Sequence, residues 1–120
     1  MSLRLVLALL LFLALCVNTR AEVVSGKLVH DGLNREFIVY TPSGVASDTP
    51  LPLVLVLHGG GGTAEKMDTW LRDELMEQVR TKGWLVILPN GVDKGWNDGR
   101  IVPDRDMTVD DLGFLNALMD

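Results

Sequence analysis

Residues 53–63 of the chain read LVLVLHGGGGT, and the fold class is predicted mainly from them. Its first five residues are leucine and valine, without the alternation of polar residues that a strand with one exposed face shows. Such a run predicts a strand buried on both faces, as in the centre of an α/β sheet. The four glycines that follow predict a tight connection, because glycine accepts backbone angles that other residues avoid.

A helix is expected directly after the glycines. Thr63 can cap its first turn, and Gly83 provides the left-handed stop that is typical of a helix end. The apolar side chains between them recur at spacings of three and four, which predicts one buried face. They are Met67, Trp70, Leu71, Leu75, Met76 and Val79. A second buried strand is expected over residues 84–88, so strand, helix and strand form a βαβ unit with parallel strands.

Elements are also recognisable on both flanks of this unit. Residues 23–41 predict a β-hairpin, since strand-forming residues surround the turn pair Asp31-Gly32. Residues 41–52 and 90–107 predict loops, because Pro, Gly and Asp interrupt them. A second helix is expected after Thr108 as its cap, with Asp110 and Asp111 in its first turn, where the helix dipole favours acids.

The N-terminus has the layout of a secretory signal peptide. Positions 5–17 are apolar and uncharged, Arg4 precedes them, and Thr19-Arg20-Ala21 supplies a small-x-small cleavage site. Residues 1–21 are therefore expected to be removed, which places the protein outside the cell or in a periplasm. The apolar run has 13 residues, whereas a membrane span needs roughly 20, so no stable span is expected.

The sequence leaves two alternatives to a cleaved leader open. The first is an uncleaved membrane anchor. The second is acylation of Cys16 in a lipoprotein box, which the large Leu15 before the cysteine disfavours.

Composition narrows the classes of partner. Residues 22–120 carry 9 Lys and Arg against 16 Asp and Glu, a net charge of −7, because Arg4 and Arg20 fall in the leader. An acidic balance argues against a nucleic-acid partner, which calls for a basic patch. The single cysteine also falls in the leader, so residues 22–120 offer no disulfide, zinc–cysteine site or thiol nucleophile.

The glycine loop carries the functional signal. Backbone N–H groups of consecutive glycines before a helix can converge on one spot, which suits an oxyanion hole, a dinucleotide phosphate site or a plain tight turn. Gly59-x-Gly61-x-x-Ala64 fits the dinucleotide pattern formally, but that fingerprint opens a fold on its first strand, and here a hairpin precedes it. A Walker loop fails because Lys66 lacks the required spacing. The oxyanion loop is favoured, made of His58, Gly59, Gly60, Gly61 and Gly62.

The polar side chains have structural interpretations beside functional ones. His58 is expected to fix the loop by hydrogen bonding rather than to transfer protons, and His30 is expected to be a solvated neighbour of the turn. Asp110 and Asp111 are expected to be a charge pair at the helix start, with one of them bonding to a neighbouring loop. No metal site is supported, since no further ligand stands at a suitable spacing.

Residues 96–98, Trp96-Asn97-Asp98, are possible substrate-cleft residues. Loops at the carboxyl ends of strands carry the site in open α/β sheets. The alternative is a glycine-flanked loop in which Trp96 packs as an anchor.

Four segments follow one another in order and spacing: LVLVLHGGGGT (53–63), WLVILPNG (84–91), GWNDGR (95–100) and VDDLGFL (109–115). Together they resemble the secreted esterases of the polyhydroxybutyrate depolymerase and feruloyl esterase group, within the α/β-hydrolase fold. The resemblance covers most of residues 25–120. It implies a serine enzyme that cleaves carboxylic esters through an acyl-enzyme and needs no cofactor.

The family's nucleophile elbow, G-x-S-x-G, is missing from this chain. Its serines are Ser2, Ser25, Ser43 and Ser47, and none stands in that pattern. The family's chain order is Ser, then Asp or Glu, then His, so no catalytic triad can be assembled. Residues 22–120 are therefore interpreted as the N-terminal part of an α/β-hydrolase domain, inactive alone. The alternative is a short secreted non-catalytic binding protein or a decayed enzyme.

Overall fold

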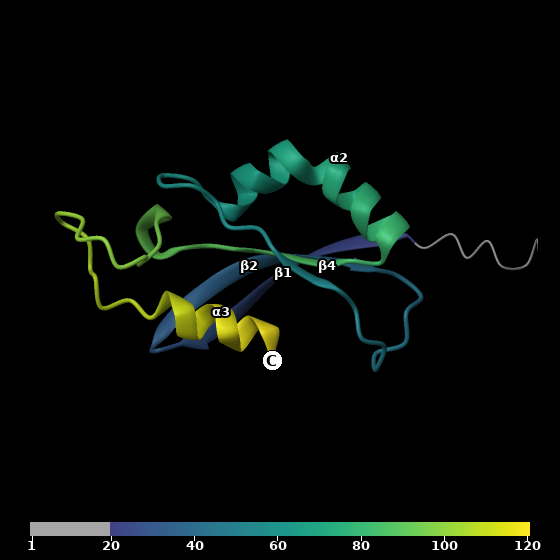
Figure 1. The fold of residues 1–120 in the computed structure, drawn as a ribbon, viewed down its shortest axis with the longest axis horizontal. Coiled ribbons are helices and arrows are strands. Elements are labelled where there is room, and N and C mark those ends of the chain that lie inside the picture. The colour runs from purple at the N-terminus through teal and green to yellow at the C-terminus, as the bar shows by residue number, and fades with distance from the viewer. Residues whose placement is uncertain (1–19) are drawn as a thin grey trace, which may run out of the picture.

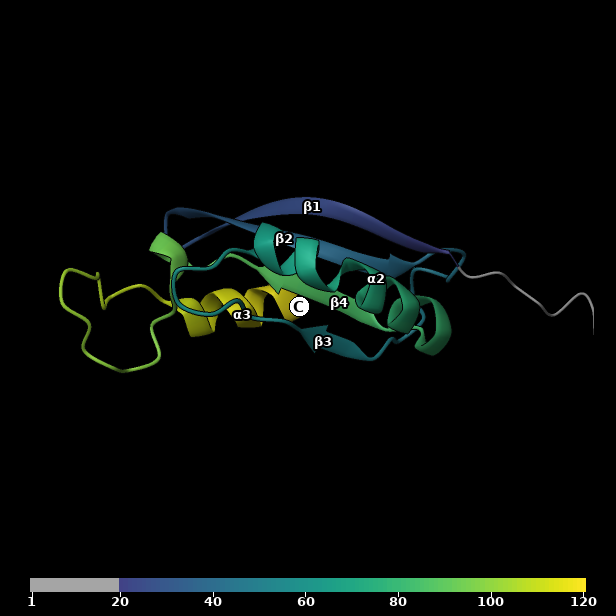
Figure 2. The same ribbon diagram turned by 90° about the horizontal axis from the view of Figure 1, so that it is seen from above.

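The computed structural model describes residues 20–120. Its elements are β1 (Ala21–His30), β2 (Leu33–Pro42), β3 (Leu53–Leu55), α2 (Ala64–Lys82), β4 (Leu85–Pro89), the short 3₁₀ helix η1 (Val92–Lys94) and α3 (Asp111–Met119). They form a mixed α/β arrangement with a four-stranded sheet in the order β1-β2-β4-β3. Helix α2 covers one face of the sheet and α3 lies on the opposite face, as Figure 1 and Figure 2 show.

The predicted signal peptide and the alternative acylation site at Cys16 concern residues 1–19, which lie outside the described residues. The last residue of the predicted leader, Ala21, is the first residue of β1 and pairs with Pro42. Within residues 20–120, no helix has the length and apolar character needed to cross a membrane.

The predicted hairpin is confirmed. Strands β1 and β2 pair antiparallel over their full lengths, from Ala21 opposite Pro42 to His30 opposite Leu33. Asp31 and Gly32 both have positive φ, at 50° and 75°, which is what a type I′ turn requires.

The βαβ unit is confirmed as well. Strands β3 and β4 pair in parallel, and α2 connects them. The Thr63 side chain accepts a hydrogen bond from the Lys66 N–H at the start of α2, and Gly83 ends the helix at φ 67°. Local capping signals of this kind depend on few neighbours, so the sequence alone places both helix ends.

The strand predicted over residues 53–57 differs from the structure. β3 is only three residues long and, within residues 20–120, lies at an edge of the sheet, so the expected burial on both faces is not found in the described chain. Leu53 and Leu57 are 37% and 44% exposed. β4 is the strand that is buried on both faces, because β2 and β3 flank it and its residues 86–89 are buried. The two apolar runs look alike in sequence, and the number of neighbouring strands decides their burial.

The core lies between α2 and the sheet. Its buried members are Ile38, Tyr40, Ala64, Leu75, Val79, Val86 and Leu88. Trp70, which was expected on the buried face of α2, is 71% exposed. Asp68 lies on that face instead, and about 200° of helix rotation separates Trp70 from it. Asp68 is buried because its carboxylate accepts hydrogen bonds from the Tyr40 hydroxyl and from Arg72.

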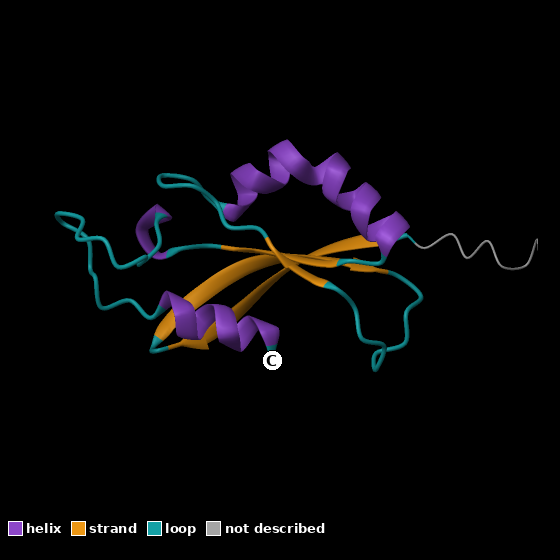
Figure 3. Cartoon of the chain, in the orientation of Figure 1, coloured by secondary structure: helices purple, strands orange, loops and turns teal. Residues whose placement is uncertain are grey.

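The long connection from β4 to α3 is loop apart from η1, as Figure 3 shows. Helix α3, which follows this connection, begins two residues later than predicted. The cap is Asp110, whose side chain accepts the Gly113 N–H, whereas Thr108 bonds to Asp106. Both are acceptable capping residues, so the sequence could not choose between them.

Candidate functional site

The glycine loop follows β3 and turns the chain into α2. The Gly62 N–H donates to the Gly59 carbonyl oxygen at 2.9 Å, and Gly61 has φ 78°. A positive φ at only the third position of a four-residue turn is the pattern of a type II turn, which favours glycine there. The Gly61 N–H donates to the Lys94 carbonyl oxygen at 2.8 Å. The turn is therefore closed on itself and tied to η1.

His58 anchors the loop from within. It is 3% exposed, its Nε2 accepts the Gly91 N–H at 3.0 Å, and its Nδ1 lies 2.8 Å from the Gly59 carbonyl oxygen. An Nε2 that accepts cannot carry a proton, so the proton is on Nδ1 and is donated to Gly59. Both ring nitrogens are thus engaged in holding backbone, which is the structural role that the sequence predicts for His58.

Two exposed backbone donors of the glycine loop have no acceptor within the described chain. The N–H groups of Gly61, Gly62 and Ala64 donate within the chain. Those of His58, Gly59, Gly60 and Thr63 have no acceptor among residues 20–120, and of these four residues Gly59 and Gly60 are the exposed ones. An exposed N–H that has no partner in the chain bonds to water, so these two successive donors are available to an acceptor from outside.

The free donors border a hollow. Its volume is about 470 Å³, and its lining is mainly apolar. It is lined by His58, Gly59, Gly60, Gly61, Gly62, Thr63, Lys66, Met67 and Trp70. The exposed Trp70 therefore lies at this hollow, a position that helical periodicity did not indicate.

Asn90, at the end of β4, connects the loop to the helix. Its Oδ1 accepts the Ala64 N–H at 2.7 Å and its Nδ2 donates to Glu65 at 3.0 Å. Burial by itself raises the pKa of Glu65, but hydrogen bonds from its own backbone N–H, Asn90 and Thr63 outweigh that effect and lower it. Asn90 was not predicted as a site residue, although a polar residue directly after a buried strand is a recognisable signal.

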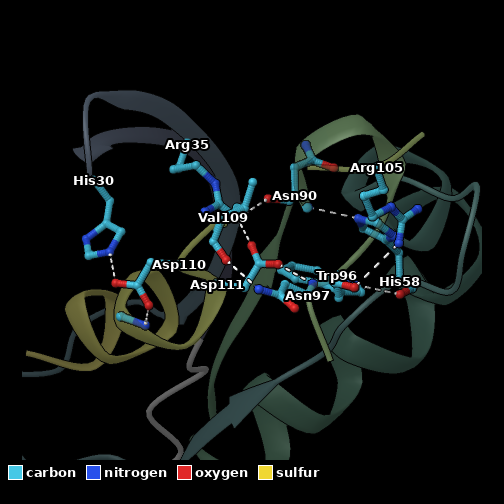
Figure 4. A network of polar contacts seen from close by, with 12 residues as sticks. His30, Arg35, His58, Asn90, Trp96, Asn97, Arg105, Val109, Asp110 and Asp111 are labelled. Atoms are coloured by element: carbon cyan, nitrogen blue, oxygen red, sulfur yellow. Dashed lines mark hydrogen bonds and ion pairs between the residues drawn. The ribbon is translucent and has the colours of Figure 1, made fainter. Parts of the chain in front are cut away.

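Trp96 bonds to the glycine loop, whereas Asn97 bonds within the connection from β4 to α3, and neither lines the hollow. The Trp96 indole N–H donates to the His58 carbonyl oxygen at 2.9 Å, and the two rings lie 5.0 Å apart (Figure 4). The Asn97 side chain donates to the carbonyl oxygens of Met107 and Val109. Asp98 is exposed and pairs with Arg100, which lowers the Asp98 pKa. For Trp96 these contacts are those of an anchor, the alternative that the sequence left open.

Asp111 makes a buried ion pair. Its Oδ1 lies 2.6 Å from Arg35 Nη2, and its Oδ2 accepts the Asn97 N–H at 2.6 Å. The Arg35 guanidinium also stacks over the Phe114 ring at 3.8 Å. The bond to Asn97 confirms that one acid of the pair reaches a neighbouring loop. Arg35 was not predicted as a site residue, since a charged residue in a strand normally faces water.

His30 is not the solvated turn residue that was expected. Its Nε2 lies 2.8 Å from Asp110 Oδ2, and its side chain is only 22% exposed. The hydrogen bond from His30, together with that from the Gly113 N–H, lowers the pKa of Asp110. The hairpin turn therefore contacts the start of α3, a long-range neighbour that local sequence could not reveal.

No group of three or more metal-binding side chains gathers anywhere in residues 20–120.

Comparison of the sequence with protein-family models and with curated proteins finds no match. Among solved structures, the chain is similar to a ferulic acid esterase, with a TM-score of 0.47 and 18% identity. The similar region covers 60% of this chain and 31% of that protein, so the chain spans less than a third of its length.

Proposed function

We propose that the chain is the N-terminal part of a secreted serine esterase of the α/β-hydrolase class, and that the loop from Gly59 to Gly62 supplies half of its oxyanion hole. The observation that carries this proposal is the pair of free N–H groups at Gly59 and Gly60 beside an apolar hollow. Neutral donors fixed before the reaction are what a developing oxyanion needs.

The complete enzyme adds a serine in a G-x-S-x-G turn, an acid and a histidine. The serine oxygen attacks the ester carbonyl carbon while its proton passes to the histidine, and the carbonyl oxygen becomes an oxyanion held by the loop. Collapse of this intermediate expels the alcohol, and water then releases the acid from the acyl-enzyme. His58 is not the base, because Gly91 and Gly59 occupy both of its nitrogens.

Secretion is part of the proposal and rests on the leader-like residues 1–21. The substrates proposed are carboxylic esters of the polyhydroxyalkanoate or feruloyl kind, on the strength of the four segments that resemble that esterase group. The 120-residue chain alone is proposed to be inactive, because none of its serines stands in a nucleophile elbow. Serine-reagent-sensitive hydrolysis of a short-chain p-nitrophenyl ester by the purified chain would contradict this.

The decisive experiment starts from the reading frame, which should continue past Asp120 into a G-x-S-x-G segment. A frame without one overturns the proposal. In the full-length enzyme, Gly60→Pro removes one free N–H yet suits the second position of a type II turn, where proline is favoured. We expect kcat to fall about 10²–10³-fold.

Gly60→Ala is the matched control. It keeps the N–H, and an added Cβ meets nothing within 4 Å. Equal kcat in the two variants would show that the Gly60 N–H takes no part in the reaction. The same enzyme, assayed on a polyhydroxyalkanoate and on a feruloyl ester, then identifies the substrate.

A further inference from the structure

We infer that Trp96 is a positioning residue that aims the Gly59 N–H into the site. This inference rests on the proposed role of the glycine loop. It concerns a residue that the sequence predicted as a possible cleft residue, because loops at the carboxyl ends of strands carry the site in open α/β sheets, and it assigns to that residue a different task.

The peptide unit between His58 and Gly59 carries the first of the two exposed donors. A trans peptide is planar, so its carbonyl oxygen and its N–H point in opposite directions, and the described chain contains no cis peptide. The Trp96 indole N–H donates to the His58 carbonyl oxygen at 2.9 Å. Fixing that oxygen fixes the direction of the Gly59 N–H, which must point away from the indole.

The next peptide unit is fixed in the same way. The Gly59 carbonyl oxygen accepts from His58 Nδ1 at 2.8 Å and from the Gly62 N–H at 2.9 Å, which sets the direction of the Gly60 N–H. The Gly91 N–H, bonded to Nε2, keeps the His58 proton on Nδ1. Each free donor therefore belongs to a peptide whose opposite end is tied.

Trp96 can hold the first peptide because it is itself held. Its carbonyl oxygen accepts from Arg105 at 3.4 Å, and its ring packs on the His58 ring. The following N–H, that of Asn97, donates to Asp111, which is paired with Arg35. Figure 4 shows this series of contacts running from β2 through the start of α3 to the glycine loop. The indole N–H is already used by His58, so it is not offered to a ligand.

The first test measures the NMR signals of the His58–Gly59 peptide. His58-Gly59 is the one His-Gly pair among the 120 residues, so a chain labelled with carbonyl-¹³C histidine and ¹⁵N glycine gives a single carbonyl–amide correlation. Trp96→Phe keeps a ring on His58 but deletes the donor. We expect the carbonyl signal to move upfield and the Gly59 amide to shift with it.

Trp84→Phe is the matched control, because Trp84 packs against the core and its ring contacts Lys82 at the end of α2. If Trp96→Phe shifts the signal no more than Trp84→Phe does, the inference is wrong. A measurement on the unaltered chain tests the inference even if a variant fails to fold. The Trp96 indole N–H should exchange with solvent more slowly than that of the exposed Trp70, and equal rates would also overturn the inference.

Kinetics of the full-length enzyme supply the second test. Losing one neutral hydrogen bond should lower kcat about two- to tenfold in Trp96→Phe, with KM within about twofold, since an oxyanion donor acts in the transition state. Trp84→Phe should change neither. If Gly60→Pro lowers kcat as expected while Trp96→Phe resembles Trp84→Phe, the inference fails and the proposed function stands. If Gly60→Pro resembles Gly60→Ala, both fail.

Discussion

Arg35 and Asp111 form an ion pair in the interior although 76 positions separate them in sequence. Their charged atoms lie 2.6 Å apart, and their side chains are only 2% and 6% exposed. A charge that is buried without its partner is costly, whereas a matched pair is tolerated. The pair therefore fastens the hairpin to α3 and to the loop that contains Trp96.

Arg35→Met should lower the free energy of unfolding by about 3–5 kcal/mol, because it leaves the Asp111 carboxylate buried and without its counter-charge. Urea unfolding followed by circular dichroism measures the loss. Lys27→Met removes the cation from the exposed Lys27–Glu36 pair, whose side chains are 71% and 53% exposed. That control should change stability by about 1 kcal/mol at most, and equal losses in the two variants would refute the role given to the buried pair.

Tyr40 should make the protein sensitive to alkali. Burial first, and then the hydrogen bond and charge of Asp68, raise the pKa of Tyr40 far above its ordinary value of 10. A raised pKa stabilises the fold below pH 10, and this contribution is lost as pH rises further. Tyr40 is the sole tyrosine, so tyrosinate absorbance should appear only together with unfolding. Tyrosinate formed near pH 10 in the folded protein would contradict the prediction.

Asp110 should contribute stability that disappears in acid. His30 first, and then the Gly113 N–H, lower its pKa, so the contribution is complete above the ordinary range of aspartate and is lost as pH falls through the lowered value. Asp110→Asn keeps a capping oxygen for Gly113 but removes the charge beside His30. It should be less stable than the original protein at neutral pH and equally stable in acid. Urea melts across pH test this, and a stability difference that stays the same from neutral pH into acid would contradict it.

Gly91→Ala should destabilise the loop. An added Cβ would overlap the carbonyl group of Gly95, and the Gly91 N–H must stay in place to bond His58. Overpacking against backbone costs about 1–3 kcal/mol, which thermal or urea melts can resolve. Gly59→Ala, whose Cβ has open space, should cost much less. If the two variants were equally stable, the close approach of residues 91 and 95 would be wrong.

What the sequence predicted correctly depends on neighbours within a few residues. Asp31-Gly32 specifies its turn by the backbone angles that these two residues accept, and Thr63 and Gly83 mark the ends of α2 in the same way. The anchoring role of His58 followed from its place before the glycines, and the structure supplies the two partners.

What the sequence could not predict depends on distant contacts. The buried Arg35 and the bridging His30 have partners 76 and 80 positions away, and no local pattern identifies such partners. Asp68 lies on the buried face because Tyr40 approaches it from another element. Leu53 and Leu57 were expected to be covered, but a run of apolar residues does not state how many strands will flank it.

The four adjacent glycines differ in whether folding requires a glycine at their position. Gly61 needs its positive φ, and a Cβ at Gly62 would press on the Gly59 carbonyl oxygen at 3.0 Å, so folding alone retains both. Around Gly59 and Gly60 there is open space, and the fold places no demand on them. Which residues are tolerated at Gly59 and Gly60 therefore depends on the group that binds their N–H groups. A mutational scan scored for folding and one scored for activity should give different results at Gly59 and Gly60 and the same result at Gly61 and Gly62.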